Sequence, residues 1–116
     1  MATDTATNSE SSQRPLAVDS ESELDDLVAS DEVVLVDFYA DWCGPCKMIE
    51  PVVERLAEET DVTVAKVDVD VNQQLASAYG VRGVPTLVLF ADGSQVEEIV
   101  GVTPEGELRS LVESYT

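Results

Sequence analysis

The only two cysteines of this 116-residue chain, Cys43 and Cys46, are separated by two residues. An apolar run precedes the pair and a segment with helical periodicity follows it, so the pair lies where a strand passes into a helix. Two thiols at this spacing can close a small disulfide ring with little backbone movement, which fits reversible oxidation and reduction. The chemistry that we expect is therefore thiol–disulfide exchange.

The start of the helix distinguishes the two cysteines. Its partial positive charge and free N–H groups favour a thiolate on Cys43, which we predict to be the attacking nucleophile. Cys46 lies one turn inside the helix, where access is poorer, so it is better suited to resolve a mixed disulfide formed on Cys43. Between them, Gly44 and Pro45 leave the outer surface of the ring free for a partner, and a proline in the first turn stiffens the ring without costing a hydrogen bond.

Two other uses of a close cysteine pair remain open. Such a pair can supply half of a zinc site, but zinc needs four ligands and the chain has no histidine and no third cysteine, so we expect no metal. A permanent structural disulfide is also compatible with the spacing. The N-terminus has neither the basic nor the apolar region of an export signal, which favours a redox role in a reducing compartment, the cytoplasm.

The elements that must position the cysteines are predicted by hydrophobic periodicity. Residues 33–38 form a near-continuous β-branched run, typical of a central strand that is covered on both faces. A helix is predicted over residues 43–59. Pro51 should kink this helix, because it cannot donate a hydrogen bond to the carbonyl of Lys47 and its ring crowds the preceding turn.

Seven further elements complete an α/β domain over residues 15–116. Before the cysteines, residues 15–18 suit a short edge strand, and Ser20 with Glu23 forms a capping box for a helix that ends near Ser30. The expected elements after the cysteines are a strand over 62–70, a short helix capped by Asn72 and ended by Gly80, strands over 86–90 and 95–100 joined by an Asp92-Gly93 turn, and a last helix with Thr103 as its cap and Pro104 in its first turn. The predicted order is β-α-β-α-β-α-β-β-α, and residues 1–14 are read as a mobile polar tail.

Composition excludes several classes of function. The chain has 24 acidic and 6 basic residues, a net charge of -18, so it lacks the basic face that nucleic acids or an anionic membrane surface would require. No apolar run approaches the length of a membrane span. A large acidic excess on a chain that still has periodic apolar runs is typical of a protein from a high-salt cytoplasm, where surface carboxylates are screened from one another.

Three segments resemble the thioredoxin family. The segment from Trp42 to Lys47 matches the active-site motif of that family, residues 36–38 match the strand before it, and residues 83–86 match its proline loop. The likeness covers residues 16–116 and implies the thioredoxin fold, a central mixed sheet of four to five strands flanked by helices. One departure is Tyr39, where many members carry tryptophan.

The resemblance also implies roles for individual residues. Asp37 would be the buried acid that takes or delivers the proton of Cys46, and a carboxyl group within an apolar run should have a raised pKa. Lys66 matches the lysine that tunes this acid, and Pro85 would be a cis proline that faces the cysteines. An apolar platform around the cysteines would consist of Trp42, Pro45, Val84, Gly101 and Val102, with the backbone of Val84 offered to an extended substrate segment.

The function implied is that of a monomeric reductase of protein disulfides, with no cofactor beyond its own cysteine pair. Its partners would be disulfide-containing client proteins and an electron donor, thioredoxin reductase or an equivalent. A thioredoxin-like binding module, in which redox turnover is incidental, is the alternative from a different class. A thiol oxidase or isomerase is an alternative within the enzymes, although Gly44 and Pro45 between the cysteines favour a reductant.

Overall fold

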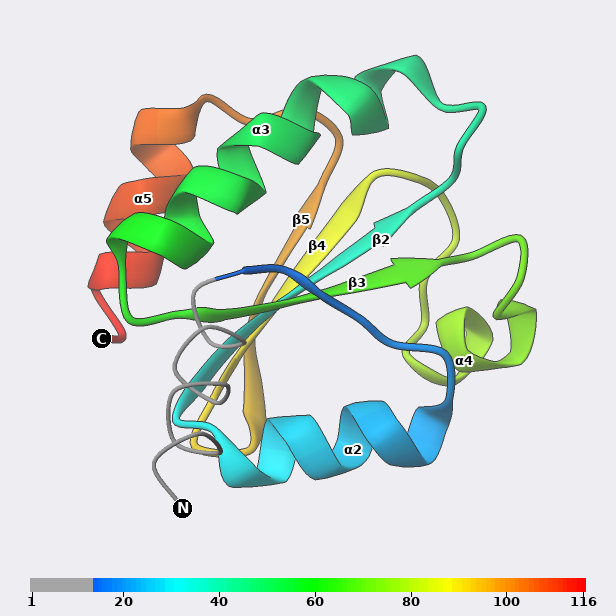
Figure 1. The fold of residues 1–116 in the computed structure, drawn as a ribbon, viewed down its shortest axis with the longest axis horizontal. Coiled ribbons are helices and arrows are strands. Elements are labelled where there is room, and N and C mark those ends of the chain that lie inside the picture. Colours follow the sequence, from blue (N-terminus) through cyan, green and yellow to red (C-terminus); the bar gives the residue numbers. More distant parts are fainter. Residues whose placement is uncertain (1–13) are drawn as a thin grey trace, which may run out of the picture.

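The computed structural model describes residues 14–116. The predicted polar tail over residues 1–14 therefore lies outside the described residues, except for Arg14. Within the described part, five strands form one mixed sheet with four helices packed around it, in the predicted order along the chain (Figure 1). The predicted fold class, a mixed sheet flanked by helices, is confirmed.

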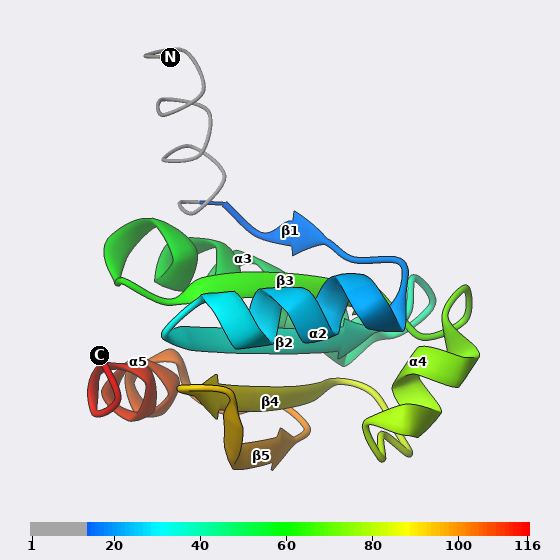
Figure 2. The ribbon, with the colours of Figure 1, turned by 90° about the horizontal axis from the view of Figure 1, so that it is seen from below.

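Strand β2 (Val33–Tyr39) is the middle strand of the sheet, whose order is β1-β3-β2-β4-β5. Figure 2 shows the five strands one above the other in this order. β3 (Thr63–Asp68) runs parallel to β2, and β1 (Leu16–Ala17) runs parallel to β3 at the edge. β4 (Thr86–Ala91) is antiparallel to β2, and β5 (Ser94–Val100) is antiparallel to β4. Because β2 has neighbours on both sides, its backbone groups are hydrogen-bonded on both sides and its position is fixed.

Two helices cover each face of the sheet. α2 (Glu21–Ser30) and α4 (Gln73–Ala78) pack on one face, whereas α3 (Gly44–Glu59) and α5 (Glu105–Glu113) pack on the other (Figure 1). Each pair of helices encloses a separate hydrophobic cluster against the sheet. The β-branched and apolar residues of β2 serve both clusters, as predicted for a strand that is covered on both faces.

The alternation of side chains along β2 determines the direction of Asp37. Val34, Val36 and Phe38 belong to the cluster under α2 and α4, while Val33 and Leu35 belong to the cluster under α3 and α5. Successive side chains of a strand point to opposite faces, so Asp37 points to the same face as Leu35. The carboxyl group therefore lies on the face covered by α3, the helix that carries the cysteines.

Two turns confirm the role predicted for glycine. Asp92 and Gly93 join β4 to β5 with φ values of 52° and 84°, the left-handed conformations that a two-residue hairpin turn of this kind requires. Gly80 follows α4 with a φ of 75°, so it ends that helix as predicted.

Two predicted helix starts are wrong in detail. The side chain of Asn72, predicted to cap α4, makes no capping hydrogen bond and instead donates to the backbone oxygen of Asp68 at 3.1 Å. The last helix begins one residue later than predicted, because Pro104 has an extended ψ of 142° and occupies the N-cap position before Glu105. Pro104 still starts the helical hydrogen bonds, since its carbonyl oxygen accepts from the N–H of Leu108 at 3.2 Å.

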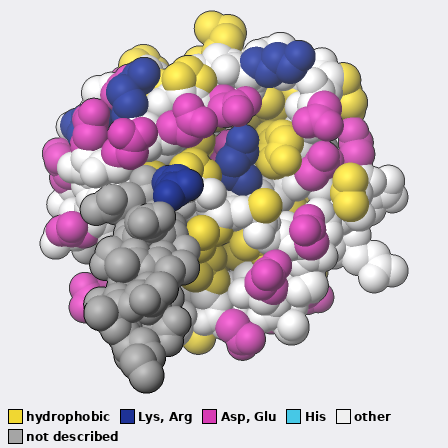
Figure 3. Space-filling view, viewed as in Figure 1, with side chains coloured by type: hydrophobic (Ala, Val, Ile, Leu, Met, Phe, Trp, Pro, Cys, Tyr) yellow, Lys and Arg dark blue, Asp and Glu magenta, His cyan; other side chains and the backbone are white. Residues whose placement is uncertain are grey.

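Acidic side chains are spread over the surface. Figure 3 shows Asp and Glu side chains across most of the face seen in Figure 1, with fewer Lys and Arg side chains among them. Arg55 and Arg109 are each paired with acidic residues, and both contact Glu105. Among residues 14–116, no helix combines the length and the apolar character needed to cross a membrane.

Candidate active site

Cys43 and Cys46 form a disulfide at the start of α3. Their Cα atoms are 5.3 Å apart, within the range that a disulfide can bridge without backbone movement. Cys43 is the N-cap residue of the helix, and its Sγ accepts a hydrogen bond from the N–H of Cys46 at 3.1 Å. Gly44 and Pro45 form the first helical turn, where a missing N–H costs no hydrogen bond. One backbone N–H group of the helix start is therefore aimed at the sulfur predicted to attack.

The expected difference in exposure between the two cysteines is not found in this oxidised form. Cys43 is 3% exposed and Cys46 is 4% exposed, because both pack against Ala40 and against the half-buried side chains of Val69 and Val84. What distinguishes the two sulfurs here is their position along the helix. Cys43 caps the helix start, and Cys46 lies within the first turn.

Asp37 is a buried carboxyl group on the face of the sheet below α3. It is 1% exposed, and its Oδ1 has no hydrogen-bond partner within the described residues. Burial raises the pKa of Asp37 from 3.8 to about 6, since desolvation disfavours the charged form. The Lys66 ammonium opposes this rise and the Glu50 carboxylate adds to it. The resulting group is ionised at pH 7 but is a stronger base than an exposed aspartate.

Lys66 lies beside Asp37 on the neighbouring strand. The two residues are partners in the register of β2 and β3. The Nζ of Lys66 lies 3.8 Å from Oε1 of Glu50 and 4.5 Å from the centre of the Tyr39 ring. A cavity of about 50 Å³ lies between these groups and Cys46, whose side chain also lines it. The structure thus brings Lys66 beside Asp37 through the strand register and beside Cys46 through this cavity, whereas Asp37 itself is absent from the cavity lining.

Two residues near this site were not predicted from the sequence. Glu50 was missed, although its position four residues after Cys46 places it one helical turn away on the same side of α3. Asp70 was also missed; its Oδ2 accepts a hydrogen bond from Nε1 of Trp42 at 2.8 Å. Asp70 follows β3, and the parallel strands β2 and β3 end at the same end of the sheet. The position of Asp70 at the end of a predicted strand was therefore the signal in the sequence that placed it near Trp42.

The proline loop lies close to the cysteines. The peptide bond between Val84 and Pro85 is cis, as the resemblance implied, and Val84 packs against the cysteine pair. The carbonyl oxygen of Pro85 accepts a hydrogen bond from the N–H of Gly101 at 2.9 Å, so the segment after β5 is attached to this loop. Gly101 has a φ of 89°, a conformation that a side chain would disfavour.

The predicted apolar platform is partly brought together. Trp42, the residue before Cys43, is 71% exposed, and Val102, the residue after Gly101, is 50% exposed, so both present apolar surface to solvent. A cavity of about 260 Å³ beside Trp42 and Val84 also includes Arg82 in its lining. Pro45, Gly101 and Val102 are absent from the lining of this cavity, so the platform is a surface around it and not a single pocket.

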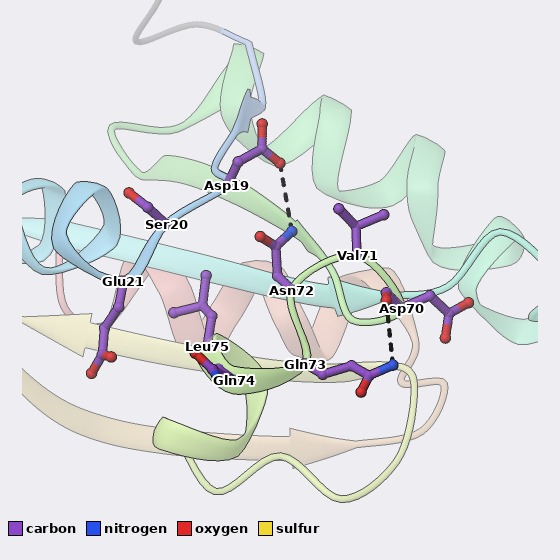
Figure 4. A pocket seen from close by; sticks show the side chains of 9 residues that line it. All are labelled: Asp19, Ser20, Glu21, Asp70, Val71, Asn72, Gln73, Gln74 and Leu75. Atoms are coloured by element: carbon purple, nitrogen blue, oxygen red, sulfur yellow. Dashed lines mark hydrogen bonds between the residues drawn. The ribbon is translucent and has the colours of Figure 1, made fainter.

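Another cavity, of about 470 Å³, lies between the start of α2 and the segment that leads into α4 (Figure 4). Its lining is mostly polar and includes Asp19, Asp70 and Asn72. Nδ2 of Asn72 lies 3.5 Å from Oδ1 of Asp19 across this cavity. None of the predicted site residues lines it, and residues 14–116 contain no group of three His, Cys, Asp or Glu side chains that could hold a metal ion.

Comparisons with known proteins agree with this arrangement. A family model described as thioredoxin matches residues 15–114. Thioredoxin from Mycobacterium tuberculosis is 52% identical over 85 residues, which are 72% of this chain and 73% of that protein. Thioredoxin from Mycoplasmoides gallisepticum is 41% identical over 96 residues, which are 82% of this chain and 96% of that protein.

Solved structures extend the similarity to the whole fold. A mutant thioredoxin from Halobacterium salinarum NRC-1 has 68% sequence identity and a TM-score of 0.88, over 91% of this chain and 94% of that one. The oxidised form of mitochondrial thioredoxin 3 from Saccharomyces cerevisiae has 31% identity and a TM-score of 0.78, over 85% of this chain and 93% of that one.

Proposed function

This chain belongs to the thioredoxin family, and we propose that it reduces protein disulfides with Cys43 as the attacking thiol, Cys46 as the resolving thiol and Asp37 as the acceptor of the Cys46 proton. As a thioredoxin it is a protein-disulfide reductase, and its active-site disulfide joins the two cysteines. The observation that carries the proposal is the position of that disulfide, at the start of α3 and above a buried carboxyl group.

In the first step, the reduced chain attacks a client disulfide. The thiolate of Cys43 forms a bond to one client sulfur while the client S–S bond breaks. The second client sulfur leaves as a thiolate and takes a proton from solvent. The N-cap position of Cys43 supports this role, because the N–H of Cys46 points at its sulfur and the helix start favours negative charge.

In the second step, the mixed disulfide is resolved. The thiol of Cys46 gives its proton to the Asp37 carboxylate, and the resulting thiolate attacks Sγ of Cys43. The bond between the two chain cysteines forms, the mixed disulfide breaks, and the remaining client sulfur leaves as a thiolate that is then protonated. Two electrons have passed to the client, and the chain is left in its oxidised form. A raised pKa of about 6 makes Asp37 a more effective base for this transfer.

The client segment would bind beside the disulfide in an extended conformation. Val84 and Pro85 would receive it, with the backbone of Val84 free to form hydrogen bonds to an extended strand. Exposed apolar surface supports this assignment, since a soluble protein gains from covering it on binding. The residues that we assign to substrate binding are Trp42, Gly44, Pro45, Val84, Pro85, Gly101 and Val102.

Membership of the family implies a reductase and client proteins as partners. We propose thioredoxin reductase, or an equivalent dithiol donor, as the source of electrons, and the cytoplasm as the site of action. The chain would act as a monomer, since one copy holds all the groups of the two steps.

Reduction of insulin disulfides, with dithiothreitol as the electron source, tests the proposal. The unaltered chain should catalyse insulin precipitation, and Cys43→Ser should reduce the rate to that of dithiothreitol alone, because the remaining thiol, Cys46, resolves mixed disulfides and does not occupy the N-cap position. Glu54→Gln is a matched control on the same helix, and it should retain full activity. Retention of full activity by Cys43→Ser would refute the proposal.

A further inference from the structure

Lys66 has two neighbours that hold its ammonium group. One is the carboxylate of Glu50, 3.8 Å away, and the other is the face of the Tyr39 ring, 4.5 Å from the ring centre. Asp37 is the partner of Lys66 in the strand register, yet among the ion pairs of residues 14–116 none joins the two side chains. Within residues 14–116, Oδ1 of Asp37 also has no hydrogen-bond partner. The ion pair of the ammonium is therefore with Glu50 and not with the neighbouring buried carboxyl group.

Glu50 is well placed to act on both Lys66 and Asp37. Glu50 lies on α3 one turn after Cys46. Glu50, Cys46 and Lys66 all line the cavity of about 50 Å³. A cavity of this size has room for a water molecule. The two-step exchange described above does not use Glu50, so its position at this cavity has no role in that account.

The Glu50 carboxylate affects Asp37 in two ways. Its own negative charge opposes ionisation of a second carboxyl group nearby, which raises the pKa of Asp37. It also attracts the ammonium of Lys66, whose positive charge lowers the pKa of Asp37. A direct contact between Lys66 and Asp37 would stabilise the ionised carboxylate and make it a weaker base.

We propose that Glu50 is a positioning residue that holds the Lys66 ammonium away from Asp37 and thereby sets the pH range in which Asp37 accepts the proton of Cys46. The inference rests on the proposed function, because it assigns Asp37 the role of base in the resolving step. It adds a second carboxylate, outside the active-site motif, to the groups that govern that step.

The groups that surround Asp37 come from β3, from α3 and from the end of β2. β4, on the other side of β2, presents Leu87 opposite Asp37 and no charge. The charged groups that act on Asp37 are Lys66 from β3 and Glu50 from α3, and Asp37 in turn acts on Tyr39 at the end of β2. The other titratable groups around Lys66 and Tyr39 are Asp68 from β3, Asp41 from the loop after β2, and Cys46 and Lys47 from α3. Of these, Glu50 is the one that contacts Lys66 as an ion pair.

The test compares Glu50→Gln with Glu54→Gln in the full-length oxidised chain. The two substitutions remove the same charge from neighbouring turns of one helix, but only Glu50 is paired with Lys66. Carbon-13 NMR titration of the Asp37 carboxyl should give a lower midpoint for Glu50→Gln than for the unaltered chain, and an unchanged midpoint for Glu54→Gln.

In the reduced chain, insulin reduction by Glu50→Gln at pH 8 should slow by roughly twofold to fivefold, because a weaker base accepts the proton less readily. Equal midpoints for Glu50→Gln and the unaltered chain would overturn the proposal, and so would equal shifts in the two variants.

A second comparison separates the effect through Lys66 from the direct effect of the charge. Glu50→Gln is introduced into a Lys66→Gln chain, where no ammonium is left to be positioned. The proposal requires a clearly smaller shift of the Asp37 midpoint in this chain than in the unaltered one. Equal shifts in both would mean that Glu50 acts by its own charge alone, and would overturn the positioning role. Either of these failures leaves the proposed reductase function intact, because that function is tested by Cys43→Ser.

Discussion

Asp37 is the residue at which folding and chemistry are in conflict. Its side chain is buried below α3, and Oδ1 has no hydrogen-bond partner in the described part of the chain, so ionisation leaves a charge that the surroundings solvate poorly. The folded protein therefore binds the Asp37 proton more tightly than the unfolded chain does, which raises the pKa to about 6. Stability is lost as the pH rises from the unfolded pKa of 3.8 through the folded pKa, and the loss is complete above it.

The first prediction is that Asp37→Asn removes a pH-dependent part of the stability. As the pH rises from 5 to 8, ionisation of Asp37 should lower the free energy of unfolding of the unaltered chain by about 1 kcal/mol. An asparagine does not titrate, so the variant should not lose this stability. Relative to the unaltered chain, the free energy of unfolding of the variant should therefore rise by this amount between pH 5 and pH 8. Urea unfolding at fixed potassium chloride concentration measures it. Parallel stability curves for the two proteins would contradict the assignment of the raised pKa to Asp37.

Single-residue roles were predictable from the sequence where a residue conflicted with its local pattern. Asp37 stood out because it interrupts a buried apolar strand, and Cys43 and Cys46 stood out by their spacing. Glu50 and Asp70 did not, because each is an ordinary acidic residue until the fold brings it to Lys66 or Trp42. Their roles depend on distances between elements, which local patterns do not contain.

At the scale of the elements, side-chain caps fix the starts of two helices. Cys43 caps α3 through its sulfur, and Ser20 caps α2 by accepting the N–H of Glu23 at 3.1 Å. The predicted capping box is present in a modified form, since the Glu23 side chain accepts from the N–H of Asp19 at 2.9 Å and not from that of Ser20. Caps of this kind fix the residue at which a helix begins, and so decide which side chains face the sheet and which face solvent.

The second prediction is that Ser20→Ala destabilises the protein by about 1 kcal/mol. The substitution leaves the N–H of Glu23 without its acceptor at the start of α2. Ser22→Ala is the matched control, because Ser22 is an exposed serine in the first turn of the same helix and has no capping role. The free energies of unfolding in urea should differ between the two variants by about this amount. An equal stability of both would show that the cap at Ser20 contributes little.

The order and type of the elements followed from periodicity, whereas their ends did not always do so. The strand predicted over 62–70 ends at Asp68, whose side chain accepts the N–H of Asp70 at 2.9 Å and turns the chain. Asn72 occupies the N-cap position of α4, but its amide is used by Asp68 instead. Such competition between local hydrogen bonds decides the last residue of an element, and composition alone does not rank the competitors. The kink at Pro51 stays a prediction, since α3 continues through this residue.

At the scale of the whole molecule, charge is the dominant feature. A net charge of -18 on 116 residues leaves most surface carboxylates without a cation. Arg55 is paired with Glu105, Arg109 with Glu59 and Glu105, and Lys66 with Glu50. Six basic residues cannot offset the repulsion among 24 acidic ones. Such a surface suits a high-salt environment, in agreement with the similarity to the protein from Halobacterium salinarum.

The third prediction is that potassium chloride stabilises the protein. The Debye length falls from about 10 Å at 0.1 M salt to about 3 Å at 1 M, so repulsion between surface carboxylates should be mostly screened by 1 M. The free energy of unfolding, measured in urea, should rise steeply over this range and more slowly above it. A flat response would contradict the halophilic interpretation of the charge.

The fourth prediction concerns the boundary of the domain. We propose that residues 15–116 are the thioredoxin domain, in agreement with the family match over 15–114. A chain that starts at Arg14 should unfold in urea with unchanged cooperativity and reduce insulin at the rate of the full chain. A several-fold loss of activity would mean that the first 13 residues take part in the function.

The division of labour between Cys43 and Cys46 is tested most directly by mass spectrometry of trapped adducts. Cys46→Ala and Cys43→Ala chains are each reduced and mixed with one disulfide-bonded client, and the products are digested without reducing agent. The account predicts a stable mixed disulfide on Cys43 in the Cys46→Ala chain, and little or no adduct in the Cys43→Ala chain. Equal or greater capture of the client by Cys46 in the Cys43→Ala chain would contradict it.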